Sequence, residues 1–301
     1  MRFEVLILGN SSATPAYGRH PTAQILRTSS QQFLIDCGEG TQMQFQSYGV
    51  KFRNLNTIFI SHLHGDHFYG LIGLITSLNL NGRKKDLNIY GPEGLEEIID
   101  TNISVSDLKL SFELKFHLLP EMSSVIYNDD EISVTAFPLI HRVATKGFLF
   151  RQNQKPLRII PDKISEYSLS IDEIRSIKKG EDLNREGLKI SNHELTKPAE
   201  KLKSYAFISD TLFSESYLEI IKNVTLLYHE ATFPEELSVR ARETYHSTAR
   251  QAAEAAIKSK AEKLIIGHFS ARYKSLETFL EEAQSVFPNT EIAEEGKTFE
   301  I

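Results

Sequence analysis

The residues best suited to chemistry form one short cluster in the first quarter of the chain. Three histidines and an aspartate occur within six positions, in the run Ser61-His62-Leu63-His64-Gly65-Asp66-His67. Side chains two positions apart on an extended segment point the same way, so His62 and His64 can bind one metal ion together. Asp66 and His67 follow a glycine that lets the chain turn, and they can serve a second ion. The cluster therefore predicts a metal site, whereas a single histidine would predict an ordinary polar loop.

The elements that must hold this cluster are indicated by apolar runs along the chain. Four runs typical of strands lead to a polar residue: 57–61 before His62, 132–139 before His141, 204–209 before Asp210 and 263–267 before His268. A fifth run, 224–228, leads to His229 and Glu230. Because a rigid sheet holds the residues that follow its strands at one edge, we expect these side chains to lie close together.

The remaining pattern alternates strands with helices. Further strands are expected at 5–8, 32–36 and 87–90, and helices at 68–80, 93–102, 248–259 and 276–286. Ser247 is a plausible N-cap for the third of these helices. Since the strands are apolar enough to be buried on both faces, the pattern favours the α/β class.

Composition limits the class of protein and at first argues against a nucleic-acid partner. The 301 residues are 41% hydrophobic and 25% charged, which excludes bulk disorder and a collagen-like repeat. One cysteine, Cys37, excludes a disulfide framework and any site built from several thiolates. The 34 Lys and Arg against 40 Asp and Glu give a formal charge of −6, whereas nucleic-acid binders usually carry a basic surplus. Ten histidines remain as candidate metal ligands.

No segment predicts export or membrane insertion, so a cytoplasmic protein is expected. Glu4 interrupts what would have to be the apolar core of a signal peptide. The longest uncharged run, 68–82, is too short and too polar to span a bilayer.

The charge is distributed unevenly along the chain. Residues 142–205 contain 14 Lys and Arg but 9 Asp and Glu, a local charge of +5 that leaves −11 for the rest. Within this stretch, 152–156 and 178–180 have the composition of loops. We therefore expect a single domain over 1–301 with an inserted, flexible arm at 146–200.

The histidine cluster resembles the H-x-H-x-D-H signature of the metallo-β-lactamase superfamily. The resemblance implies a four-layer αββα sandwich with a metal site at one edge of its sheets. It also implies the remaining ligands, with His141 as the third histidine of the first metal, Asp210 as the bridging carboxylate and His268 completing the second metal. Such a set would hold two zinc ions per subunit, or other divalent metals in their place.

Five blocks are similar to the ribonuclease Z family within that superfamily. They are 61–68 with the two Gly-Leu pairs that follow, 38–42 (Gly-Glu-Gly-Thr-Gln), 229–233 (His-Glu-Ala-Thr-Phe), 246–249 (His-Ser-Thr-Ala) and 268–273 (His-Phe-Ser-Ala-Arg-Tyr). The blocks stand in family order over most of the chain. The resemblance implies a zinc-dependent endoribonuclease that removes 3′ trailers from precursor tRNA by two-metal phosphodiester hydrolysis, leaving a 3′-hydroxyl on the tRNA.

The same resemblance implies catalytic roles for three residues. Asp66, beside the attacking water, matches the family's proton acceptor. Glu230 and His246 match a pair that delivers a proton to the leaving ribose oxygen, and a carboxylate that raises the pKa of an imidazole is the physical reason for such a pair. The alternative for Glu230 and His246 is an ordinary buried ion pair that holds a helix start in place.

Contacts to RNA and a partner subunit are implied in the same way. Ser270, Arg272 and Thr248 are expected to contact RNA near the cut, since hydroxyls and a bidentate cation suit phosphate. A solvated charge at a helix start is the alternative for Arg272. In the family an arm of one subunit clamps tRNA for the active site of the other, so the resemblance implies precursor tRNA as partner and a homodimer.

The arm itself matches the family less well than the blocks do. Its cations are candidates for phosphate contacts: Arg151, Lys155, Arg158, Lys163, Lys178 and Lys179. The Gly-Pro pair that usually stands near the tip of the family's arm is absent between Lys146 and Asp210. For any single lysine there, a solvated surface position is the alternative to an RNA contact.

Three rival functions remain open from the sequence. One is a broader phosphodiesterase or 3′ exoribonuclease that uses the same two metals on other substrates. Another is a catalytically silent RNA-binding scaffold on the same fold, which the complete set of seven ligand residues argues against. A small-molecule hydrolase resembles the chain only through the metal ligands.

Overall fold

The protein was examined as a computed structural model, which describes residues 2–185, 187–199 and 201–301. The chain divides into two compact units. The main unit comprises residues up to 128 together with 133–151 and 203–301, and the small unit comprises 129–132 and 152–202. Every candidate site residue lies in the main unit, whereas five of the six candidate cations of the arm lie in the small unit.

The first sheet of the main unit is mixed and has the strand order β18-β1-β3-β4-β5-β6-β7. Its strands are β1 (Glu4–Gly9), β3 (Ala23–Arg27), β4 (Gln32–Cys37), β5 (Leu55–Phe59), β6 (Leu87–Gly91), β7 (Leu114–Leu118) and β18 (Thr298–Glu300). β4, β5, β6 and β7 are parallel to one another, so the residues that follow β4, β5 and β6 reach the same edge of the sheet.

The second sheet has the order β17-β15-β14-β13-β10-β9-β8. Its strands are β8 (Ser124–Asn128), β9 (Ile132–Leu139), β10 (Thr145–Gln152), β13 (Ser204–Ile208), β14 (Leu226–Glu230), β15 (Lys263–Gly267) and β17 (Thr290–Ile292). β13, β14 and β15 are parallel to one another. A further short parallel pair, β2 (Ser11–Ser12) with β16 (Phe269–Ser270), joins loops that follow strands of the two large sheets.

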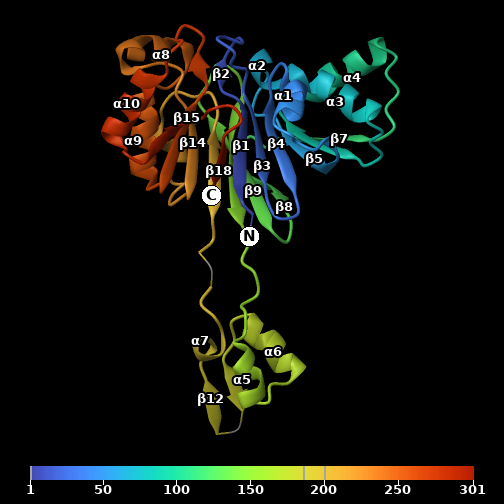
Figure 1. The fold of residues 1–301 in the computed structure, drawn as a ribbon, viewed down its shortest axis with the longest axis vertical. Helices are drawn as coiled ribbons and strands as arrows, with labels where there is room; N and C mark the ends of the chain where they lie inside the picture. The colour runs from blue at the N-terminus through green and yellow to red at the C-terminus, as the bar shows by residue number, and fades with distance from the viewer. Residues whose placement is uncertain (1, 186, 200) are drawn as a thin grey trace. The chain divides into compact units, whose positions relative to one another are not determined.

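Helices cover the outer face of each large sheet (Figure 1). The first sheet is covered by α1 (Thr41–Ser47), α3 (Gly70–Leu80) and α4 (Leu95–Val105), and the second by α8 (Ser238–Thr244), α9 (Ala249–Ser259) and α10 (Glu277–Val286). Short helical turns complete the main unit: η1 (Phe52–Asn54), α2 (Gly65–Phe68), η2 (Glu215–Tyr217) and η3 (Glu235–Leu237).

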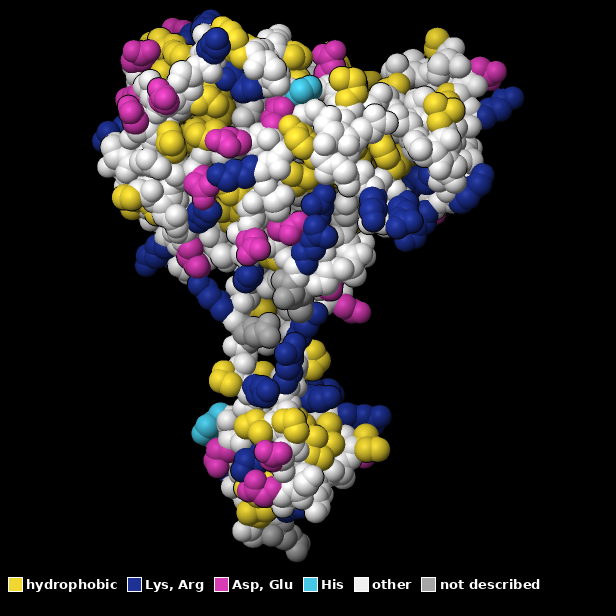
Figure 2. Space-filling model, in the orientation of Figure 1, with side chains coloured by type: hydrophobic (Ala, Val, Ile, Leu, Met, Phe, Trp, Pro, Cys, Tyr) yellow, Lys and Arg dark blue, Asp and Glu magenta, His cyan; other side chains and the backbone are white. Residues whose placement is uncertain are grey.

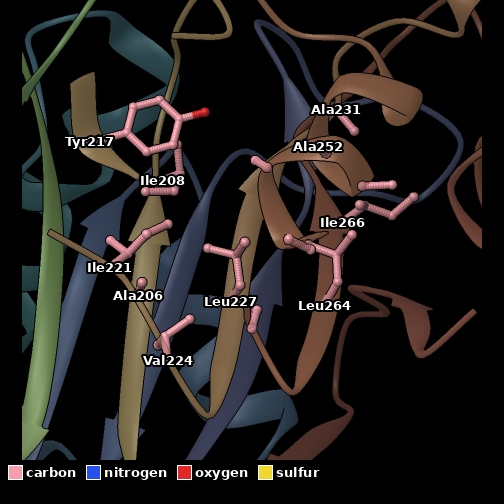
Figure 3. Close-up of a cluster of buried hydrophobic side chains, with 14 of the residues drawn as sticks. Ala206, Ile208, Tyr217, Ile221, Val224, Leu227, Ala231, Ala252, Leu264 and Ile266 are labelled. Carbon is pink, nitrogen blue, oxygen red and sulfur yellow. The ribbon is translucent and has the colours of Figure 1, made fainter. Parts of the chain in front are cut away.

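Two kinds of apolar packing hold these layers together. Between the sheets, the ring of Phe59 lies 5.4 Å from that of Phe148 and 5.5 Å from that of Phe150, centroid to centroid. On the outer face of the second sheet, Figure 3 shows strand residues such as Ile208 and Leu227 packed in a buried cluster with Ala252. Because both faces of each sheet are buried, the layers run helix, sheet, sheet, helix, and the predicted αββα sandwich is confirmed.

The small unit has secondary structure and a core of its own. Its elements are α5 (Pro161–Glu166), α6 (Ile171–Lys178), β11 (Leu183–Arg185), β12 (Leu188–Ile190) and α7 (Asn192–Leu195). A buried cluster that includes Ile177, Leu183 and Leu195 lies between them. The arm was expected over 146–200, but 146–151 belong to β10 of the main unit, and residues 186 and 200 lie outside the described part of the chain.

Several expected element boundaries shift in the structure. The helix expected at 68–80 is two helices, α2 and α3, and the helix expected from 93 begins at Leu95. Glu230 is the last residue of β14 rather than a residue beyond it. Within the described residues, no helix is both long enough and apolar enough to cross a membrane.

Candidate metal centre

The predicted ligand residues come together where strands of both large sheets end. His62 and His64 follow β5, His141 follows β9, Asp210 follows β13 and His268 follows β15. Asp66 and His67 lie in α2, whose four residues turn the chain back toward the same point. The side chains that follow these strands therefore lie close together, as expected from the sequence.

The first donor set consists of His62, His64, His141 and Asp210. Nδ1 of His64 lies 3.1 Å from Nε2 of His62 and 3.2 Å from Nε2 of His141. Oδ2 of Asp210 is 3.5 Å from Nε2 of His62 and 3.7 Å from Nε2 of His141. The ligand atoms of these four side chains thus surround one small space.

The second donor set consists of Asp66, His67 and His268, and the other oxygen of Asp210 joins it. Nε2 of His268 is 3.2 Å from Nε2 of His67 and 3.3 Å from Oδ2 of Asp66. Oδ1 of Asp210 lies 3.2 Å from His268 and 3.4 Å from His67. Asp210 therefore offers one oxygen to each donor set, which is the position of a bridging carboxylate.

These separations suit divalent cations with nitrogen and oxygen ligands. Two nitrogens that each lie about 2.0–2.1 Å from a tetrahedral cation are about 3.3 Å apart, close to the nitrogen separations in both sets. Oδ1 of Asp210 is buried and has no hydrogen-bond partner among the described residues. Burial, together with the neighbouring His67, lowers the pKa of His62 to about 3, which favours the neutral imidazole that binds metals. The donor chemistry fits zinc.

A hydrogen bond to the far nitrogen fixes the ring orientation of four histidines in the centre. Asp36 accepts from Nδ1 of His67 at 2.7 Å, and the carbonyl of Tyr245 accepts from Nδ1 of His141 at 2.8 Å. Oγ1 of Thr232 lies 2.9 Å from Nδ1 of His268, and Oγ of Ser61 lies 3.0 Å from Nδ1 of His62. Such contacts direct the opposite nitrogen toward the metal.

Sequence reasoning missed Asp36, Thr232 and the carbonyl of Tyr245. Asp36 is fully buried near the end of β4 and has a φ of 55°, a left-handed conformation that costs free energy. It also accepts hydrogen bonds from the backbone N–H and the hydroxyl of Ser61. A carboxylate at the end of an otherwise apolar strand was the signal that could have identified it.

Glu230 and His246 lie beside the centre and have different environments. The carboxylate of Glu230 is fully buried and accepts five hydrogen bonds: from the N–H groups of Thr211, Ser247 and Thr232, the hydroxyl of Thr232 and Nδ1 of His246. The His246 side chain keeps 11% of its surface exposed. Burial lowers the pKa of His246, but the carboxylates of Glu230 and Asp210 outweigh it and raise the pKa to about 9. Of the two, only His246 can reach a substrate.

The three predicted RNA contacts differ in their surroundings. Arg272 is exposed and its guanidinium lies over the ring of Phe233, 5.9 Å from the centroid. Ser270 is in β16, two residues beyond His268. Thr248 is fully buried, and its hydroxyl donates to Glu235 and accepts from the N–H of Gln251.

The start of α9 also corrects the expected N-cap. Thr248 is the N-cap residue, in a capping box with Gln251, whereas Ser247 had been expected in that role. The hydroxyl of Ser247 donates to the carbonyl of Thr211 and its N–H donates to Glu230, so Ser247 is bonded to these two residues and not to the first turn of the helix.

A second loop touches the centre from the N-terminal side. The N–H of Ala13, which follows β2, donates to Oδ2 of Asp66 at 2.7 Å. Ala13 has a φ of 61°, so the loop holds a left-handed residue where it meets Asp66. The sequence of this loop gave no sign of the contact, because turns of similar composition are common.

Comparison with known proteins places this geometry in a family. Residues 3–155 match the family model described as "Anti-Pycsar protein Apyc1", a segment that contains His62, His67 and His141 but not Asp210 or His268. The short form of human tRNase Z is 26% identical, with a TM-score of 0.72 over 99% of both chains. The metallo-β-lactamase fold protein YhfI from Bacillus subtilis is similar in fold, with a TM-score of 0.71 at 17% identity over 100% of both chains.

Curated relatives match the whole chain. Ribonuclease Z of Bacteroides thetaiotaomicron is 43% identical over 100% of this chain and 96% of its own length. Ribonuclease Z of Cytophaga hutchinsonii is 45% identical over 100% of this chain and 97% of its own length. Identity above 40% over nearly the whole length of both proteins shows that the chain belongs to the ribonuclease Z family.

Proposed function

We propose that this chain is a zinc-dependent endoribonuclease that removes 3′ trailers from precursor tRNA and leaves a 3′-hydroxyl on the tRNA. The observation that carries the proposal is a complete pair of donor sets joined by Asp210, in a chain that belongs to the ribonuclease Z family. A silent scaffold would have no need to keep every donor atom in this arrangement.

The two donor sets are the proposed zinc sites. His62, His64, His141 and Asp210 would hold one ion, and Asp66, His67 and His268 would hold the other together with Asp210. When bound, such ions polarise water and offset the negative charge of a phosphodiester. The chain's own residues have to orient the substrate and move the protons.

Proton movement is assigned to Asp66 and His246. A water oxygen attacks the phosphorus, the bond to the ribose 3′-oxygen breaks, and the trailer keeps a 5′-phosphate. Asp66 accepts the proton that the water loses, and the N–H of Ala13 holds the Asp66 carboxylate in place. His246 gives a proton to the departing 3′-oxygen. Its Nδ1 faces Glu230, so Nε2 is the nitrogen that meets the substrate.

Recognition of the substrate is assigned to Ser270, Arg272 and the cations of the small unit. The exposed guanidinium of Arg272 suits bidentate contact with phosphate. Thr248 is not among the contacts that we propose, because its hydroxyl is buried in the α9 cap. We further propose a cytoplasmic homodimer in which the small unit of one subunit, with its arm cations, binds tRNA for the other.

One experiment separates this function from its rivals. The protein, loaded with zinc, is incubated with a 3′-extended precursor tRNA, a single-stranded RNA and a small phosphodiester. A single cut next to the discriminator base, absent after chelation and restored by zinc, is the expected result. Progressive trimming of any RNA end would favour the 3′ exoribonuclease, and tRNA binding without cleavage would favour the silent scaffold.

A further inference from the structure

A second concentration of charge lies in the main unit, away from the candidate metal centre. A hollow of about 810 Å³ is lined by five cations and no acidic residue: Lys51, Arg53, Arg83, Lys84 and Lys85. Its other lining residues include Phe52 and Leu78. Figure 2 shows Lys and Arg side chains gathered beneath β5 and β7 in the view of Figure 1. We call this feature the basic hollow.

Four of its cations are available to a ligand. Lys51, Arg53, Lys84 and Lys85 are exposed, and no ion pair within the described residues includes any of them. The nearest acidic residue in the sequence, Asp86, is paired with Lys115 at 2.7 Å. A cluster of unpaired like charges repels itself, so it favours an anionic partner.

The fifth cation fixes the shape of the hollow. Arg83 is buried, and its guanidinium donates to the carbonyls of Leu55 and Asp86 at 2.6 and 2.5 Å. The same guanidinium lies over the ring of Phe112, 5.3 Å from the centroid. Arg83 therefore ties the loop after α3 to the start of β5, and Lys84 and Lys85 project from a fixed backbone.

A purely local explanation accounts for only part of this cluster. Cations just beyond the C-terminus of a helix are favoured by the helix dipole, which explains Arg83 and Lys84 after α3. It does not explain Lys51 and Arg53, which come from a separate segment before β5. Two segments thus bring unpaired cations to one place, although the formal net charge of the whole chain is −6.

The position of the hollow relates it to the candidate metal centre. The hollow lies where β5 begins and α3 ends, whereas the centre lies where β5 ends and α3 begins. β5 with five residues and α3 with eleven are each about 16 Å long, and the cations and ligands lie beyond their ends, so the separation is at least about 16 Å. A strand that spans this separation carries at least about five phosphates, at about 3.4 Å for each.

We propose that the basic hollow binds the phosphate backbone of the precursor RNA at least about five nucleotides from the bond that is cut. The proposal rests on the proposed function for the identity of the RNA. A strand that enters the centre is the polyanion best able to reach this surface. The chemistry is contact with phosphates, so no base specificity is expected.

The test removes two of the free charges at a time. The variants are Lys51→Gln with Arg53→Gln, and Lys84→Gln with Lys85→Gln. The matched control is Lys222→Gln with Lys260→Gln, which removes two exposed lysines of the main unit outside the hollow. Precursor tRNA binding is measured by fluorescence anisotropy over a range of salt concentrations, and cleavage and hydrolysis of bis(p-nitrophenyl) phosphate are measured alongside.

Each hollow variant is expected to raise the Kd for precursor tRNA about tenfold and to lower the salt slope of log Kd by about 1.4–1.8. Hydrolysis of the small diester stays within twofold, and the control variant binds RNA as the parent protein does. Unchanged Kd and salt slope in both hollow variants would overturn the proposal. If the parent protein bound tRNA but did not cut it, the proposed function would be wrong. The binding data would still show whether the basic hollow contacts the RNA.

Discussion

At the scale of single residues, Asp210 is the side chain that joins the two donor sets of the proposed centre. Its two oxygens face different donor sets, and one of them has no hydrogen-bond partner within the described residues. A buried carboxylate oxygen without a hydrogen bond is costly, so a bound cation is a favourable partner for it. We therefore expect metal to stabilise the proposed centre as well as to supply its chemistry.

Asp66 provides the most direct test of the proposed chemistry. We predict that Asp66→Ala abolishes cleavage of precursor tRNA, a fall in kcat of more than about a thousandfold, because the proton acceptor is lost. Binding of precursor tRNA largely survives, since Asp66 lies at the cut and not on the cationic surfaces. Asp100→Ala on the exposed side of α4 is the control and leaves kcat unchanged. Parental turnover in Asp66→Ala would sink the assignment.

Glu230 and His246 are predicted to separate stability from catalysis. Glu230→Gln replaces an acceptor oxygen with an amide donor among five donors, so it lowers the free energy of unfolding by about 2–3 kcal/mol. His246→Gln has a smaller effect on unfolding but lowers kcat about a hundredfold or more. Urea unfolding and kcat are measured on both proteins. A fully stable Glu230→Gln protein would contradict the anchoring role of Glu230.

At the scale of elements, the cap of α9 connects helix stability with the loop of His246. Thr248 completes a capping box and donates to Glu235, so its hydroxyl is fully used within the protein. We predict that Thr248→Ala lowers the free energy of unfolding by about 1 kcal/mol and leaves KM for precursor tRNA unchanged. Ser170→Ala, which removes the capping box of α6, is the comparison. A higher KM at unchanged stability would instead indicate that Thr248 contacts the RNA.

The strand-end pattern predicted much of the site and left out what depends on distant contacts. His62, His141, Asp210 and His268 each follow an apolar run, which indicated their place at strand ends, and the family resemblance singled out the last three as ligands. Asp36 meets His67 across 31 positions, and the carbonyl of Tyr245 meets His141 across 104. Contacts of this kind depend on which strands pair, which hydrophobic pattern alone does not determine.

Boundaries in the arm were hidden for a related reason. The charge pattern indicated an insertion but not that β10 continues to Gln152. Residues 146–151 form a strand because they pair with β13, and β13 lies more than fifty positions further along the chain. The core of the small unit, with Ile177 and Leu183, is too dispersed in the sequence to have been recognised as such.

At the scale of the whole molecule, the two units are predicted to be separable. Arg151 and Ser204 are paired neighbours on the antiparallel strands β10 and β13, so a two-residue Asn-Gly turn can replace 152–203. We predict that the shortened protein folds, binds zinc and hydrolyses a small diester within about threefold of the parent rate, because the main unit has its own cores. Its KM for precursor tRNA rises about tenfold or more, through loss of the small unit's phosphate contacts.

Zinc content, small-diester hydrolysis and KM for precursor tRNA are measured on the same preparation. Leu188→Ala, at an exposed position of β12 that leaves the core and the cations of the small unit in place, is the control. An unchanged KM in the protein that lacks 152–203 would contradict a role for the small unit in binding tRNA.

The distance along the sequence between the members of the second donor set has a consequence during synthesis. His67 and His268 are 201 positions apart, and their ring nitrogens nevertheless face each other. A chain growing from its N-terminus has no complete second set until residue 268 has been added. Prematurely terminated or partly degraded copies that lack this segment therefore cannot assemble the proposed centre.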